Sequence, residues 1–409
     1  MDPHIILLIN ASLFVSLTFI VFKKKSVNIL AKLSSLMYSF IAICTYFFSL
    51  KGVYELNGLK LWPFLVYFFI FYILILPYIK STSMTDRFKI YNIHNANIIA
   101  NGYILCCVIQ IFLSLEKTVS AIRSGNYLTI YLSRGDVNLY DNFFEQVVIN
   151  IVNYFFIPMV VYGFYVLAHR INYKYKWFLL IIPFIASVMY ALSYASRTEF
   201  FNLLLIYGSV YFLFYNYYST GTNKLAILLG VIFVGIMLVG SMAITESRFE
   251  GDDEGEWVSG YFGDSNIIAH DTFVYTTQYS NGTYFFRNVT SLLGERPIPT
   301  ICTKDHGFGF RSMISTRFSD FGPIGLIIYV IICLLFFSYF LRKRNLSWGA
   351  ITILFYFYKC LTLGALYENN NELSWLYVLI VAFILNFLTR KKYGKNYSVL
   401  SPTVSSHAS

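Results

Sequence analysis

Charged residues are scarce in this chain. Only 13% of its 409 residues are charged, whereas 57% are hydrophobic. An ordinary soluble domain has about a quarter charged residues, so this chain could not cover a surface facing water. The scarcity excludes a soluble enzyme and leaves lipid as the solvent. The net charge of +10 would suggest nucleic acid in a soluble protein. Here the basic residues stand mostly between apolar runs, so we interpret them as topology signals and expect no nucleic-acid partner.

Cysteine is also sparse. There are six cysteines, and only Cys302 lies in a long polar segment, because the others fall inside apolar runs. Neither a disulfide framework nor a metal-ligand spacing follows from them. The acidic run at 250–256 could bind a divalent cation, but its spacing misses the EF-hand pattern, and a solvated loop is the preferred interpretation. We therefore predict no metal and no cofactor.

The apolar residues come in long blocks. Blocks of about 17–22 residues match a helix that crosses roughly 30 Å of hydrocarbon, and they lack the period-two alternation of a membrane barrel. The sequence therefore predicts an all-α polytopic membrane protein with about eleven transmembrane helices. The expected spans are 5–22, 29–50, 61–79, 98–115, 147–167, 177–194, 200–217, 225–244, 324–341, 348–366 and 375–388.

The distribution of Lys and Arg predicts the orientation. More than half of the 31 basic residues fall in alternate connections, beginning with Lys23–Lys25 and ending after Arg390. By the positive-inside rule, the N-terminus is expected outside and the C-terminus in the cytoplasm. The first apolar block precedes its positive charges, unlike a signal peptide, so we expect it to remain as a membrane helix.

This orientation divides the chain into four parts. Residues 1–244 hold the first eight helices with a medium outer loop at 116–146, and 245–322 form one large extracytoplasmic loop. Residues 323–389 hold the last three helices, and 390–409 form a cytoplasmic tail. The large loop is rich in aromatic residues, which disordered segments lack, so we expect it to fold against the membrane face.

Several basic residues are candidates for binding an anion. Arg197 stands at the outer start of the seventh span, where the free N–H groups and dipole of a helix attract anions. In the alternative reading, Ser196 and Glu199 form a capping box there. Arg311 and Arg317 lie shortly before the ninth span. Two further candidates are Arg248, in the large loop, and Lys359, whose charge is costly inside the tenth span.

A proton acceptor on the outer side is sought among four residues. His306, in a glycine-flanked turn close to Arg311, ranks above His270 because such a turn can approach a ligand. Asp320 is a candidate base too. The residues from Ser319 to Gly325 are, however, typical of a helix start, which Asp320 could cap. Glu199 is discounted as a cap.

Some of these strings resemble a known family. Ser196-Arg197-Thr198, Phe318-Ser319-Asp320-Phe321-Gly322 with Gly325, and Arg123-Ser124-Gly125-Asn126-Tyr127-Leu128 look like those of Wzy-type O-antigen polymerases. The layout of aromatic-rich spans with one large loop in the second half is similar across nearly the whole chain.

The resemblance implies a GT-C-like glycosyltransferase in a bacterial inner membrane. It would join undecaprenyl-diphosphate-linked oligosaccharide repeat units into O-antigen or capsule-type polysaccharide at the periplasmic face, without a nucleotide sugar or metal. Membrane lipid and a chain-length regulator protein would be its partners. An O-antigen ligase is the alternative within the class. A lipid-linked glycan flippase or transporter is the alternative outside it, and an outer-surface receptor or acyltransferase also stays open.

Overall fold

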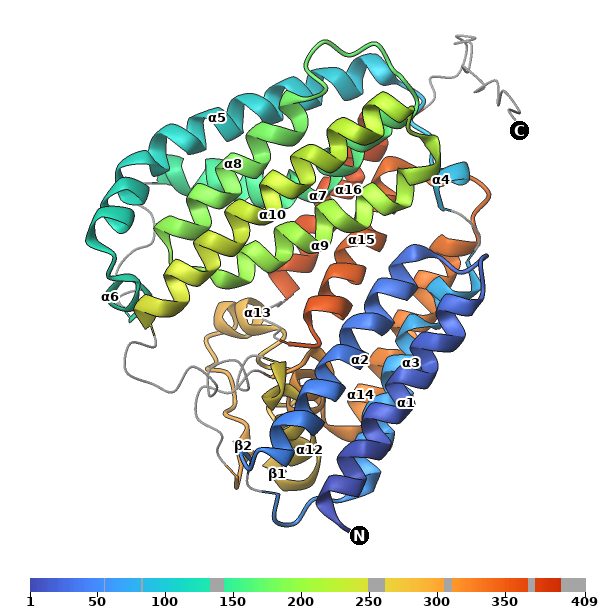
Figure 1. The fold of residues 1–409 in the computed structure, drawn as a ribbon, viewed down its shortest axis with the longest axis vertical. Helices are drawn as coiled ribbons and strands as arrows, with labels where there is room; N and C mark the ends of the chain where they lie inside the picture. Colours follow the sequence, from blue (N-terminus) through green and yellow to red (C-terminus); the bar gives the residue numbers. More distant parts are fainter. Residues whose placement is uncertain are drawn as a thin grey trace. The chain divides into compact units, whose positions relative to one another are not determined.

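The structure is a computed structural model, and it describes residues 1–54, 56–81, 84–132, 143–248, 262–304, 311–366 and 372–390. Within these ranges the secondary structure is helical apart from one two-stranded sheet, and turns and irregular segments connect the elements (Figure 1). The chain forms two compact units. The first comprises 1–87, 246–346 and 353–380, and the second comprises 88–245, 347–352 and 381–409.

The first unit is built from helices of the N-terminal and C-terminal thirds of the chain. Its elements are α1 (Pro3–Lys23), α2 (Ile29–Leu50), α3 (Leu61–Lys80), α4 (Met84–Arg87), α12 (Asp264–Tyr275), β1 (Thr276–Gln278), α13 (Arg287–Leu292), β2 (Ile301–Cys302) and α14 (Met313–Arg342). Most of α15 (Trp348–Leu363) and the first half of α16 (Glu372–Thr389) also belong to it.

Aromatic rings fill the centre of the first unit. The rings of Tyr38 and Phe71 stack with centroids 3.8 Å apart, and Phe14 lies 5.7 Å from Tyr38. All three side chains are buried. Such pairs add about 0.5–1.5 kcal/mol each beyond the burial of their area, so they hold α1, α2 and α3 together.

The two ends of the first unit differ in character. Helix α12 and the two strands lie at the same end as the N-terminus (Figure 1), where Thr45 of α2 and Lys60 before α3 contact α12. At the opposite end, the Arg87 guanidinium donates to the carbonyls of Leu341 and Lys343. The basic runs that follow α1 and end α14 belong to this second end. The orientation of these two ends across the membrane stays a prediction of the positive-inside rule.

The second unit consists mainly of helices from the middle of the chain. They are α5 (Ile93–Ser124), α6 (Tyr127–Leu132), α7 (Phe143–Ala168), α8 (Phe178–Ser193), α9 (Arg197–Phe214), η2 (Tyr215–Tyr217) and α10 (Thr220–Arg248), whose last three residues fall in the first unit. Helix α5 packs against α7 and α8, and α9 packs against both of these. The ring of Phe184 stacks on Phe233 at 3.6 Å and so joins α8 to α10.

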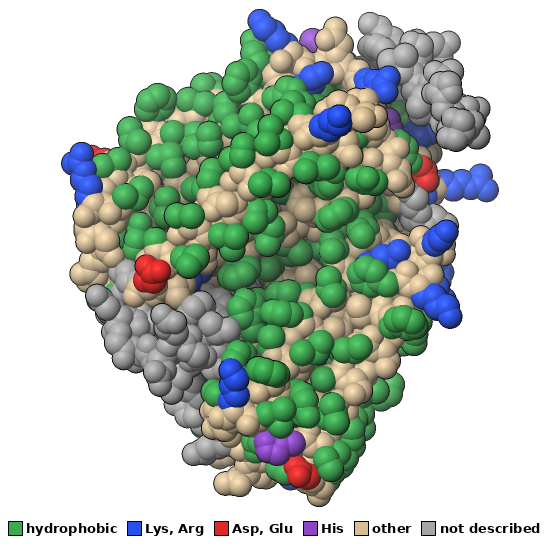
Figure 2. All heavy atoms as spheres, viewed as in Figure 1, with side chains coloured by type: hydrophobic (Ala, Val, Ile, Leu, Met, Phe, Trp, Pro, Cys, Tyr) green, Lys and Arg blue, Asp and Glu red, His purple; other side chains and the backbone are tan. Residues whose placement is uncertain are grey.

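The prediction of an all-α polytopic membrane protein is confirmed. Within the described residues, eight helices are long and apolar enough to cross a membrane, and three more apolar helices, at 178–193, 348–363 and 373–389, are shorter. Every expected span is helical, whereas the count of eleven crossings stays a prediction. Hydrophobic side chains cover most of the face in Figure 2, as a surface in contact with lipid requires.

The ninth expected span differs in where its helix begins. Helix α14 starts at Met313 instead of Ile324, because Ser312 caps it by accepting from the Ser315 amide. Gly322 interrupts it with φ 70° and ψ −179°, a conformation that is essentially restricted to glycine. Pro323 then begins the apolar part, as a first-turn proline does. The segment 313–321 is thus a separate helical stretch, which the sequence analysis had placed in the loop.

Candidate functional site

Helix α12 is buried on all of its faces. Every side chain from Ser265 to Phe273 is buried, including those of Asn266, His270, Asp271 and Thr272. The helix packs against α2, α3 and α14. Because buried polar groups require hydrogen-bond partners, its polar side chains fix how the long loop is held.

Two contacts at the start of α12 attach it to the end of α2. The Thr45 hydroxyl donates to the Gly263 carbonyl at 2.9 Å and accepts from the Asn266 amide at 3.1 Å. The pKa of Tyr54 is raised far above its usual value, mainly by burial. The carboxylate of Asp264, to which Tyr54 is hydrogen-bonded, is the second cause. Tyr54 therefore remains a neutral donor to Asp264 at any physiological pH.

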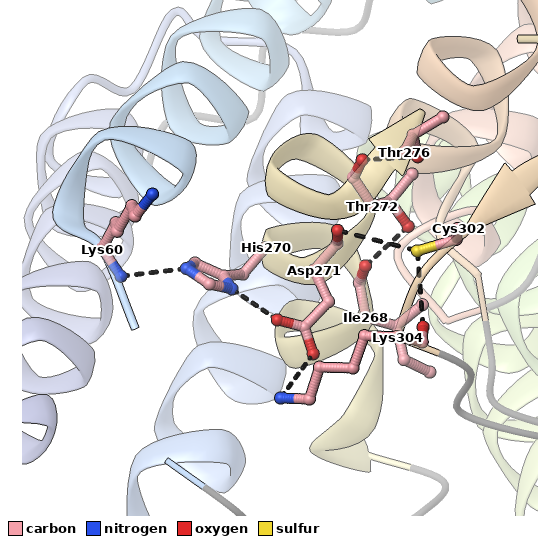
Figure 3. Close-up of polar contacts among 8 residues, drawn as sticks. All are labelled: Lys60, Ile268, His270, Asp271, Thr272, Thr276, Cys302 and Lys304. Atoms are coloured by element: carbon pink, nitrogen blue, oxygen red, sulfur yellow. Dashed lines mark hydrogen bonds and ion pairs between the residues drawn. The ribbon is translucent and has the colours of Figure 1, made fainter. Parts of the chain in front are cut away.

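His270 forms the centre of a buried chain of polar contacts (Figure 3). The backbone amide of Lys60 donates to its Nε2 at 2.9 Å, and its Nδ1 lies 2.7 Å from Oδ1 of Asp271. The other oxygen of Asp271 is 3.1 Å from Nζ of Lys304. The ring of Phe64 stacks on the imidazole at 5.3 Å. The chain therefore joins α3, α12 and the segment after β2.

These contacts select the tautomer of His270. A backbone amide can only donate, so Nε2 carries no proton, and Nδ1–H donates to the carboxylate. Asp271 in turn is neutralised by Lys304, as a buried carboxylate requires. His270 could accept a proton from a substrate only by giving up its bond to Lys60. The geometry favours a role in positioning the loop.

Asp320 organises a second part of the loop. Its carboxylate accepts from the Ser280 hydroxyl at 2.5 Å and from the amides of Tyr284 and Phe285 at 3.3 and 2.8 Å. Three donors from one turn of the loop thus converge on this one carboxylate. Asp320 stands near the end of the helical stretch 313–321, before Gly322, and its carboxylate binds the loop instead of capping the apolar part of α14.

Arg317 is almost completely enclosed. Its side chain is 2% exposed, and its guanidinium carbon lies 4.5 Å from the centroid of Phe285 and 5.8 Å from that of Tyr329. A guanidinium over aromatic faces is attracted by their quadrupoles, more strongly where water is excluded. Asp320 accepts from the backbone amide of Phe285. It therefore also positions the Phe285 ring on which the Arg317 guanidinium packs.

Two other predicted cations lie on the elements that meet at the start of α14. The Met313 amide donates to the Gly364 carbonyl, just beyond α15, at 2.6 Å. Arg311, which precedes this contact by two residues, is exposed. Lys359 lies on α15 with its Nζ 5.9 Å from the ring of Tyr356. The structure thus brings the segments that carry Arg311, Arg317 and Lys359 together in one unit.

Arg197 belongs to the second unit. It begins α9, as predicted, and is 3% exposed. Its Nη1 donates to the hydroxyl of Thr245 on α10 at 3.1 Å. The capping box is not formed, because Ser196 makes no side-chain cap bond and Glu199 instead accepts from Asn202. From the sequence we also expect Arg197, Arg311 and Arg317 to bind one diphosphate, because each lies at or near an outer helix end, and this expectation stays a prediction.

Other sequence predictions fall outside what is described. His306 and the acidic run at 250–256 lie outside the described residues. Arg248 is the last residue of α10, and its side chain lies outside the description as well. Within the described part of the chain, no group of three His, Cys, Asp or Glu could hold a metal ion.

The turn that Asp320 holds was not predicted from the sequence. The Thr283 amide donates to the Ser280 carbonyl at 3.0 Å, and Asn281 and Gly282 between them both have positive φ. This is the geometry of a type I′ turn, and Asn-Gly is its strongest signal. The dipeptide could have located the turn, but not its partner forty residues later.

Comparison with known proteins adds no relative to this description. No family model, curated protein or solved structure matches the chain.

Proposed function

We propose that this protein is a membrane glycosyltransferase. It polymerises undecaprenyl-diphosphate-linked oligosaccharide repeat units into O-antigen or capsule-type polysaccharide at the periplasmic face of the bacterial inner membrane. Its layout and three short strings support this proposal through their resemblance to Wzy-type polymerases. The structural observation that carries it is the enclosed guanidinium of Arg317.

A diphosphate leaving group needs fixed positive charge. Arg317 offers a planar fork that matches phosphate oxygens, and its aromatic surroundings lower the local dielectric, which strengthens the attraction. An arginine already held in place loses little further freedom on binding. Arg311 and Lys359 add charge on the neighbouring segments, and Arg197 is proposed to join them.

The reaction needs one bond formed and one broken. An acceptor sugar hydroxyl attacks the anomeric carbon of the donor, and the bond from that carbon to the diphosphate oxygen breaks. The electron pair leaves with undecaprenyl diphosphate, which the arginines stabilise without a general acid. The hydroxyl proton passes to a base, for which His306 remains our candidate.

The contacts of His270 and Asp320 suit them to positioning. His270 anchors α12 to the start of α3, and Asp320 holds the ring of Phe285 beneath Arg317. We therefore assign both residues to the arrangement of the site and leave the proton transfer to His306.

The test is the polysaccharide made by a strain that lacks the gene. A polymerase mutant keeps a single repeat unit on its lipid acceptor but loses the ladder of longer chains. Loss of every unit would instead indicate a ligase or a flippase and would overturn the proposal.

The site is tested by complementing that strain. Arg317→Lys keeps the charge but removes the bidentate fork, so we expect the ladder to fall by about tenfold or more at normal protein level. Arg287→Ala, which removes an exposed arginine of the same loop, should restore a full ladder. A full ladder from Arg317→Lys and from Arg317→Ala would remove the site from this position.

A further inference from the structure

The segment 284–298 exposes its apolar side chains and buries a polar one. Leu292 is 86% exposed and Leu293 is 73% exposed, whereas Thr290, in the same short helix α13, is only 7% exposed. Tyr284, Phe286, Val289 and Ile298 are exposed as well. The segment also exposes Arg287, Ser291, Glu295 and Arg296, so its outer surface combines large apolar side chains with charged ones, as that of an interfacial element does.

The exposed leucines indicate that the segment lies in an apolar environment. Two leucines left in water would cost about 1.5–3 kcal/mol each relative to an apolar environment. Contiguous exposed apolar residues mark a protein or membrane contact. In the second unit, α10 likewise exposes Leu238 and Val239 and buries Thr245, and it is long and apolar enough to span the membrane.

The apolar surface of the segment continues onto a membrane span. The rings of Phe286 and Phe321 lie 6.5 Å apart, and Phe321 in turn stacks on Tyr329 of α14 at 6.2 Å. Just beyond Phe321, Ile324 is 75% exposed at the start of the apolar part of α14. The bonds from Asp320 to the amides of Tyr284 and Phe285 hold the segment at this end of the helix.

We propose that residues 284–298 form an interfacial element that lies in the leaflet on the side of the long loop. Leu292 and Leu293 enter the acyl chains, and Tyr284 and Phe286 lie at the level of the headgroups, where aromatic rings favour the boundary. The partner that covers this apolar surface is the lipid bilayer. The proposal is independent of the function proposed above.

The test places a photo-crosslinking benzoylphenylalanine at Leu292 in the full chain. The protein is reconstituted in vesicles of phosphatidylethanolamine and phosphatidylglycerol, irradiated and digested, and the adducts are identified by mass spectrometry. Ile324, on the span, is the control for lipid contact, and Thr277, an exposed polar residue of β1, is the control for water.

The proposal expects lipid adducts at Leu292 in a yield like that at Ile324 and about tenfold above that at Thr277. Crosslinks from Leu292 to other peptides of this chain would show that the leucines pack on protein. A lipid yield no higher than at Thr277 would show that they face water. Either result overturns the proposal. Because Leu292 is so exposed, its replacement leaves the folded packing intact, and crosslinking at Ile324 in parallel verifies insertion.

Discussion

The carboxylate of Asp320 accepts the hydroxyl of Ser280 at 2.5 Å, across forty residues of sequence. With the amides of Tyr284 and Phe285, this bond ties the turn of the loop to the helical stretch that also carries Arg317. One buried carboxylate therefore connects the order of the loop with the position of the enclosed arginine.

We predict that Asp320→Asn loosens this connection. Asparagine offers one acceptor oxygen and turns an NH2 group towards donors, so at least one bond to a charged acceptor is lost, at a cost of about 1.5–3 kcal/mol. Thermal unfolding in nanodiscs should occur at lower temperature, and proteolysis near Thr283 should be faster. Glu295→Gln, at an exposed carboxylate of the same loop, is the matched control. Equal stability of the two variants would contradict this role for Asp320.

We predict that His270→Gln preserves activity, whereas His270→Ala destabilises the protein. Glutamine can accept from the Lys60 amide and donate to Asp271, but alanine leaves the Lys60 amide unsatisfied and removes one donor from Asp271, which keeps Lys304, at about 1–3 kcal/mol for each lost bond. The measurements are the amount of folded protein and in vitro polymerisation of lipid-linked repeat units from pH 6 to 8. A well-folded His270→Gln variant without turnover would identify His270 as the base.

Gly322 provides a test of the break in α14. A Cβ at φ 70° and ψ −179° is strained and would meet the ring of Tyr279 at 3.4 Å. We expect Gly322→Ala to lower stability by about 1–3 kcal/mol. At Gly102, inside α5, a Cβ meets nothing within 4 Å, so Gly102→Ala should be neutral or stabilising by up to about 1 kcal/mol. Similar effects at both positions would argue against the break.

The orientation is tested with reporter fusions. A phosphatase that is active only in the periplasm should be active when inserted between Gly251 and Gly255 and inactive when fused after Lys395. A cytoplasmic fluorescent reporter should give the opposite result. The expectation follows from the excess of Lys and Arg in alternate connections. Phosphatase activity from the C-terminal fusion would reverse the predicted topology.

The sequence alone determined the class of the protein and the position of its long apolar helices, but not the helices within the loop, α12 and the stretch 313–321. Each expected apolar span is helical in the structure, because the transfer of about twenty apolar residues into lipid is a local property that windowed hydropathy measures. Helix breaks and turns that have a local sequence signal could also be predicted. Gly322-Pro323 indicated the start of the apolar part of α14, and Asn281-Gly282 carried the signal of a turn.

The tertiary structure decided which polar residues meet. Nothing in the sequence around His270 indicates that the Lys60 amide donates to it, or that Lys304 neutralises Asp271. Ser196 and Glu199 have the spacing of a capping box, yet Glu199 binds Asn202 instead. Hydropathy records the cost of burying a polar group, whereas the partner that offsets this cost comes from another element. That partner is set only when the helices pack.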